Sequence, residues 1–196
     1  MEKTAIVIAA TAAVLFAPPA FAQAQNFEGA SAGLQVRSVS TKLEATGSRV
    51  TSTADSTTQD LMLVLGYDFA VSNKVVLGVG MDVGTLTRKL GTFSGSTVTN
   101  ESKSNVGIFG TVGYTVTDTV LLYGKIAQQG TNVKSSTSGD VSFIGPAFGL
   151  GAKALFGKNW QGPAEYLQGT YGDKAFQGET DKLKSTSFSL GVSYKL

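Results

Sequence analysis

The sequence predicts an all-β fold, an eight-stranded antiparallel up-and-down transmembrane β-barrel. Bulky apolar residues alternate with small or polar residues along eight segments, and this period of two is typical of strands. The connections between these segments are alternately short and long. No segment after the amino terminus is apolar for the length of a membrane-spanning helix. Because strands cross lipid only when every backbone group is paired, we expect them to close into a barrel.

The amino terminus has the layout of a secretory signal peptide. A charged start is followed by an apolar run at 5–16, then by Pro18 and Pro19, and then by an A-x-A cleavage site at 20–22. This run is shorter than the ~20 apolar residues that a transmembrane anchor needs. We therefore expect residues 1–22 to be a cleaved signal peptide and residues 23–196 to form one membrane-barrel domain.

Seven predicted strands precede the last one, at 30–37, 59–70, 75–85, 105–116, 120–128, 142–156 and 160–171. Most are close to the ~9–11 residues that a tilted strand needs to cross a bilayer. In 75–85, for example, Val75, Leu77 and Val79 share one face, while Gly78 and Asp82 share the other. The large apolar residues of the other segments form similar faces: Leu34 and Val36; Leu61, Leu63, Leu65, Tyr67 and Phe69; Val106, Ile108, Val112, Tyr114 and Val116; Val120, Leu122 and Ile126; Phe148, Leu150 and Phe156; and Tyr166.

The last predicted strand, 187–196, has the clearest alternation. Each odd position is small or polar, and each even position is large and apolar. A strand here places five apolar side chains on one face. These are Phe188, Leu190, Val192, Tyr194 and Leu196.

The connections predict which end of the barrel faces which compartment. Tight turns are expected at 71–74, 117–119 and 157–159. Long loops rich in Ser, Thr and Gly are expected near 39–58, 87–104, 129–140 and 172–184. Short periplasmic turns that alternate with long outer loops are typical of outer-membrane barrels, and both chain ends then lie on the periplasmic side.

A soluble up-and-down barrel of the lipocalin kind also has eight alternating strands. In such a barrel the apolar face turns inward and the polar face turns outward. Here the face opposite the apolar one carries mainly Gly, Ser, Thr and isolated charges. Small and polar residues suit the narrow lumen of an eight-stranded barrel, so the sequence favours an apolar face in contact with lipid.

The turn between the sixth and seventh strands carries a resemblance to a known family. The chain reads Phe156-Gly157-Lys158-Asn159-Trp160 and then Ala164-Glu165-Tyr166. This resembles the small outer-membrane β-barrel family of Gram-negative bacteria, the OmpX-like and OmpA barrel-domain-like proteins of the porin family. Leu196 stands where the family usually has Phe, and Pro163 stands where it often has Arg. Since proline removes a backbone donor, we expect a bulge or a locally unpaired site at Pro163.

The resemblance implies a location and partners. The expected location is the cell outer membrane, and the expected partners are outer-membrane lipid and lipopolysaccharide. The alternating end of the chain, from Phe188 to Leu196, resembles the family's assembly signal, which implies contact with periplasmic chaperones and the barrel-insertion machinery. Leu196 in the last position is expected to weaken that recognition. The net charge is only +2 and the charges are scattered, so no nucleic-acid partner is expected.

The residue inventory argues against enzymatic chemistry. The chain has no His and no Cys. Enzymes built on similar barrels use His as a base or activator, and transition-metal sites depend largely on His and Cys. We therefore expect a non-enzymatic protein without a cofactor or metal site.

Four charged residues are predicted to face the lumen together: Asp82, Lys125, Lys153 and Glu165. Each lies on the face opposite the apolar one, a few residues from a short turn. Pairing across the 157–159 turn would put Lys153 opposite Pro163 and within diagonal reach of Glu165. We expect an ionic cluster that closes the lumen. The alternative is a set of unconnected charges that are solvated by lumen water.

These observations lead to one functional hypothesis and one alternative. The hypothesis is an outer-membrane protein with a role in envelope structure and in interactions of its surface loops, whose ligand the sequence does not identify. The alternative is a narrow pore for ions or very small solutes, which needs an unblocked lumen.

Overall fold

The computed structural model describes residues 24–46, 51–85, 88–92, 99–135, 139–176 and 179–196. Side chains are described over 24–41, 57–85, 105–131, 144–171 and 184–196. The predicted signal peptide, residues 1–22, lies outside the described residues. No helix among the described residues is long and apolar enough to cross a membrane.

The described chain is almost entirely strand. It begins with a short 3-10 helix, η1 (Ala24–Phe27), and continues through nine strands: β1 (Gly29–Thr46), β2 (Thr51–Ala70), β3 (Val75–Gly84), β4 (Arg88–Thr92), β5 (Thr99–Thr117), β6 (Val120–Ser135), β7 (Gly139–Leu155), β8 (Trp160–Phe176) and β9 (Glu179–Lys195).

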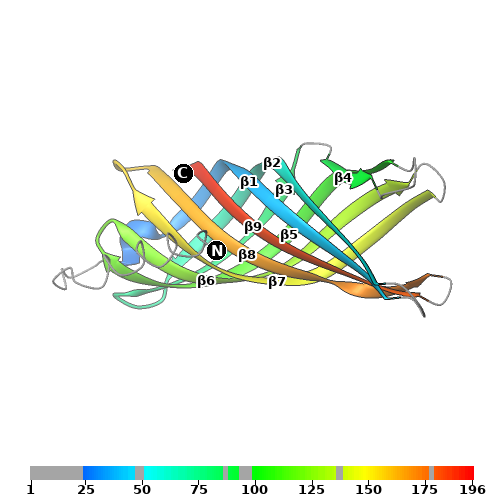
Figure 1. Ribbon diagram of the computed structural model, residues 1–196. Helices are drawn as coiled ribbons and strands as arrows, with labels where there is room; N and C mark the ends of the chain where they lie inside the picture. Colours follow the sequence, from blue (N-terminus) through cyan, green and yellow to red (C-terminus); the bar gives the residue numbers. More distant parts are fainter. Residues whose placement is uncertain (1–23, 47–50, 86–87, 93–98, 136–138, 177–178) are drawn as a thin grey trace, which may run out of the picture.

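The strands form a closed antiparallel barrel (Figure 1). Their order is β3-β2-β1-β9-β8-β7-β6-β5-β4, and pairing of β3 with β5 closes the sheet. The short β4 pairs with β5 beyond the end of β3. β3 and β4 therefore count as one interrupted strand of the barrel. The prediction of an eight-stranded up-and-down barrel is therefore confirmed.

The strands are longer than predicted at the end opposite the short turns. Strands β1 and β2 pair out to Thr46 and Thr51, and β8 and β9 pair out to Phe176 and Glu179. Most of the residues assigned to long loops are therefore strand, and that prediction is wrong. These parts carry little apolar alternation because they extend past the membrane-facing belt, where no apolar face is needed. Pairs of Ser and Thr side chains support them instead, as where the Ser40 and Thr57 hydroxyls lie 3.0 Å apart.

The two faces of the barrel are arranged as predicted. Large apolar side chains are exposed on the outside, with Leu150 71% exposed and Leu122 37% exposed, which suits a surface that contacts lipid. The side chains of Phe188, Leu190, Val192, Tyr194 and Leu196 all belong to this outer surface. Their orientation is confirmed, whereas their part in assembly stays a prediction.

Aromatic residues gather on the outside near the short turns. Trp160 and Tyr194 pair across β8 and β9, with their ring centres 5.1 Å apart. Tyr67 and Phe69 lie at the same end of β2, with their rings 4.5 Å apart. Rings in this position are typical of the girdle at a membrane interface.

Two local features explain how this sequence fits a narrow barrel. At Gly149, an added Cβ would collide with the backbone oxygen of Tyr166, so only glycine allows the neighbouring strand to curve this closely. At Pro163, the pairing of β8 with β9 is interrupted and then resumes at Ala164 in the same register. The unpaired site expected there is present, without a bulge.

Candidate functional site

The four charged residues predicted to face the lumen all point inward. Asp82 comes from β3 and is 2% exposed, and Lys125 comes from β6 and is 4% exposed. Lys153 on β7 and Glu165 on β8 have side chains that are 16% and 10% exposed. In the structure, as in the sequence pattern, these four side chains therefore lie on the lumen side of their strands.

Lys125 is the centre of one group of charges. Its Nζ donates to Glu165 Oε2 at 2.8 Å and lies 4.0 Å from Asp82 Oδ2. The same ammonium lies 3.9 Å from the centre of the Phe109 ring, in a cation–π contact. Lys125 thus compensates part of the charge of two carboxylates that come from different sides of the barrel.

Tyr123 is the second hydrogen-bond partner of Glu165. Its hydroxyl donates to Glu165 Oε1 at 2.7 Å. Tyr123, Gly151 and Glu165 lie in line across three neighbouring strands. Because Gly151 has no side chain, the tyrosine ring lies over it and reaches the carboxylate, and a Cβ at Gly151 would collide with this ring. The inward glycines therefore leave the space in which the polar side chains meet.

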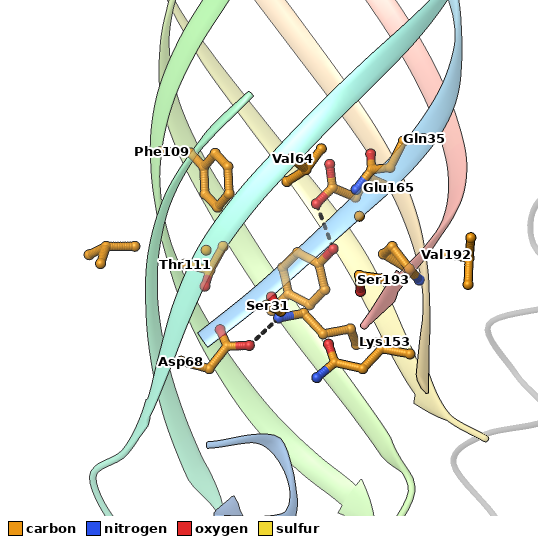
Figure 2. A pocket seen from close by; sticks show the side chains of 16 residues that line it. Ser31, Gln35, Val64, Asp68, Phe109, Thr111, Lys153, Glu165, Val192 and Ser193 are labelled. Atoms are coloured by element: carbon orange, nitrogen blue, oxygen red, sulfur yellow. Dashed lines mark hydrogen bonds and ion pairs between the residues drawn. The ribbon is translucent and has the colours of Figure 1, made fainter. Parts of the chain in front are cut away.

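Lys153 has a different partner from the one expected. The register is as predicted, with Lys153 opposite Pro163, but the Lys153 ammonium donates to Asp68 of β2 (Figure 2). Glu165 is held by Lys125 and Tyr123 instead. The expected Lys153–Glu165 pair is therefore wrong. In so narrow a lumen a long side chain reaches a strand across the barrel as easily as a diagonal neighbour on the next strand.

We call the set of Asp68, Asp82, Tyr123, Lys125, Lys153 and Glu165 the ionic layer. Four of these residues were predicted from the sequence to form a cluster, whereas Asp68 and Tyr123 were not. Both lie at inward positions of predicted strands, so the alternation along these strands already indicated that they face the lumen.

A second ion pair lies nearer the hairpin end of the lumen. Arg37 Nη2 lies 3.4 Å from Asp60 Oδ2, and the Asn105 amide donates to the same oxygen at 3.5 Å. Arg37 and Asp60 are directly paired across β1 and β2, and both are almost fully buried. This pair is not among the residues predicted from the sequence, although both residues occupy inward positions.

The ionic layer borders a small cavity of about 40 Å³, enough for a few water molecules (Figure 2). The buried carboxamides of Gln35 and Gln161 line it together with Asp68, Lys153 and Glu165. Within the described residues, no group of three or more His, Cys, Asp or Glu side chains is placed to hold a metal ion. The arrangement can hold charges in fixed positions across the lumen.

Comparisons with known proteins give a family match and several structural likenesses. The family described as "Outer membrane protein beta-barrel domain" matches residues 7–195. The chain is similar in structure to neisserial surface protein A, with a TM-score of 0.55, 17% identity and coverage of 86% of this chain and 100% of that one. It is also similar to Ail, the attachment invasion locus protein of Yersinia pestis, solved in complex with the heparin analogue sucrose octasulfate. That likeness has a TM-score of 0.54, 15% identity and coverage of 86% and 99%.

A comparison with curated protein sequences gives no match. At these identities the structural likenesses show the fold alone, while the family match spans nearly the whole chain. The chain is an outer-membrane protein and belongs to the outer membrane protein beta-barrel domain family.

Proposed function

We propose that this protein is a non-enzymatic outer-membrane barrel that contributes to envelope structure and binds partners through its surface hairpins. The observation that carries the proposal is the filled lumen. The ionic layer and the Arg37–Asp60 pair place buried, mutually bonded side chains across it at successive heights. A lumen filled in this way supports a structural role rather than transport.

Planar-bilayer recording tests this part of the proposal. The folded protein is expected to give no discrete conductance steps. The alternative function is a narrow pore, and the small cavity beside the ionic layer favours it, since the packing of the lumen is not continuous there. Discrete steps from the unmodified protein would reject the closed barrel in favour of this pore.

The interaction role is supported by a break in the sheet beyond the membrane belt. Pairing between β7 and β8 ends at Ala147 and Gly169, although β7 begins at Gly139 and β8 runs on to Phe176. In Figure 1 the β6–β7 and β8–β9 hairpins end apart from each other, away from the short turns. Each hairpin therefore offers a strand edge with unpaired backbone groups, and such edges bind extended peptides by strand addition.

A proline substitution tests this edge. Along β7, the Leu155 amide bonds toward β6 and the Phe156 amide toward β8. By alternation, the Ser142 amide points to the free edge. Ser142→Pro removes that donor and leaves the ladder to β6 intact, while Ser142→Ala keeps the donor and is the matched control.

The probe is a phage-displayed peptide library panned against the folded protein. Enriched peptides are expected to bind the unmodified protein and Ser142→Ala, and to bind Ser142→Pro at least tenfold more weakly, which corresponds to about 1.4 kcal/mol. Equal binding to all three, or no enrichment, would reject the β7 edge as a binding surface.

A further inference from the structure

The amino-terminal turn of the described chain enters the lumen from the short-turn end. In Figure 1, η1 lies at this mouth of the barrel. Ala24 and Phe27 are both 0% exposed. They pack in one apolar cluster with Val76, Leu121 and Tyr123, three inward residues of the barrel wall.

Three hydrogen bonds hold η1 in place. The Ala24 amide donates to the Asn73 carbonyl at 3.0 Å, and the Asn26 side chain donates to the Asp118 carbonyl at 3.0 Å. Lys195, near the end of β9, donates to the Asn26 carbonyl at 2.7 Å. Two of these bonds reach short turns and the third reaches the last strand, so η1 is fixed to the rim from several sides.

A glycine hinge at the first residue of β1 lets the chain turn from η1 into the strand. Gly29 has φ = +127°, a conformation that residues with a side chain rarely adopt. This hinge turns the chain from the first strand back into the mouth. A side chain at position 29 would strain the docked arrangement in particular, because η1 can adopt another direction when it is not docked.

The bonds and contacts that dock η1 are separate from the ladders that close the barrel. Pairing of β1 with β2 begins at Gly29, opposite Asp68, and pairing of β1 with β9 begins at Ser31, opposite Lys195. Residues 24–27 of η1 take part in neither ladder, so η1 can leave the mouth without breaking a strand pair of its own. Its removal does uncover Tyr123, whose ring belongs to the apolar cluster and whose hydroxyl bonds Glu165 in the ionic layer.

We propose that η1 is a built-in stopper of the periplasmic mouth, which undocks by rotation about Gly29 and opens the lumen beneath the ionic layer to water while the barrel stays folded. Two barriers then close the lumen in series. The first is the apolar stopper, and the second is the ionic layer above it.

Thiol labelling tests this proposal, because the chain has no native cysteine. Val76→Cys places a reporter thiol at a position that is 1% exposed beneath Phe27. Phe27→Ser removes the apolar anchor of η1, and Gly29→Val strains the hinge. In detergent micelles, each variant is expected to raise the rate of modification by a charged thiosulfonate at least roughly tenfold, because backbone strain or lost packing shifts the docking equilibrium.

Two controls separate undocking from general loosening. Met62→Cys places a thiol in the hairpin-end half of the lumen, where the native residue is 2% exposed, and its modification rate is expected to stay unchanged. Glu28→Gln changes an exposed residue between anchor and hinge and is expected to have no effect on either thiol.

The gel mobility of unheated samples reports whether the barrel is folded. Folded variants with faster labelling at position 76 alone are the expected result. An unchanged rate in both stopper variants would overturn the proposal. So would a loss of the folded form in both, or equal acceleration at position 62, because η1 would then be an integral part of the barrel.

Discussion

The bond between Lys125 and Glu165 gives the sharpest quantitative test of the ionic layer. Glu165→Gln removes the charge of a carboxylate that is only 10% exposed and lies 2.8 Å from the Lys125 ammonium. Loss of one partner of a buried pair costs about 3–5 kcal/mol in general. Here Lys125 keeps Asp82 at 4.0 Å and the face of Phe109, and the glutamine oxygen still accepts from Tyr123. We therefore expect the free energy of unfolding to fall by about 2–3 kcal/mol.

The reciprocal change, at Lys125, is expected to lower the free energy of unfolding further. Lys125→Met leaves Glu165 and Asp82 without the cation that lies between them, so the expected loss is about 3–5 kcal/mol. In the double variant the Glu165 carboxylate is absent, so no charge at position 165 is left without a partner. Only Asp82 then lacks the cation that Lys125 provided. The two losses are therefore expected to be non-additive by about 1–3 kcal/mol.

Urea titrations in lipid vesicles, under conditions where folding is reversible, measure these free energies. Glu28→Gln serves as the control, because Glu28 is exposed and belongs to no strand of the barrel, and a change below about 0.5 kcal/mol is expected. A second double-mutant cycle combines Lys153→Met with Glu165→Gln. The coupling between these two residues is expected to be weaker than that between Lys125 and Glu165, since Lys153 is bonded to Asp68. Additive losses for Lys125 and Glu165, or stronger coupling for the Lys153 cycle, would refute this account of the layer.

Three further predictions follow from the topology and the packing. An epitope inserted at Ser48 is expected to be accessible to antibody on intact cells, and one at Asn73 only after permeabilisation; the opposite pattern would reverse the orientation. Leu122→Arg puts a charge on the lipid face and is expected to cost about 2–4 kcal/mol in a vesicle refolding titration, whereas Leu122→Met should be nearly neutral; equal stabilities would mean that this face does not contact lipid. Gly151→Ala places a methyl group against the tyrosine ring of the ionic layer and is expected to cost about 1–3 kcal/mol by the same titration. Gly110→Ala, where the nearest atom would lie at 3.8 Å, is its control and should be tolerated.

The space around a lumen glycine does not follow from its face alone. Gly80 lies on the inward face of 75–85, and from that face alone Gly80→Ser is expected to be milder than a charge on the lipid face. An added Cβ there would instead collide with the Phe109 ring and approach the Leu65 backbone oxygen at 2.5 Å. Since backbone cannot move aside cheaply, this substitution is expected to be costly. The face was predicted correctly, but the available space depends on the curvature of the closed sheet.

The sequence by itself determined the membrane-spanning part of the strands, the order of these parts and the side on which their residues lie. These properties follow from the period of two and from the short turns, which are local. The turn at 157–159 even predicted that Lys153 lies opposite Pro163, as observed. The same local signals were too weak to show that the Ser- and Thr-rich segments continue as strands, because no apolar face marks them outside the membrane.

Only the tertiary structure decided which charges meet and what closes the mouth. Lys153 bonds Asp68 across the lumen, and Lys125 lies between Asp82 and Glu165 from opposite walls. These partners depend on the tilt and stagger of the closed sheet, which set the height of each side chain and are not encoded in alternation. The docking of Phe27 in the mouth depends on the same closure, because the apolar cluster that receives it is assembled from strands far apart in the chain.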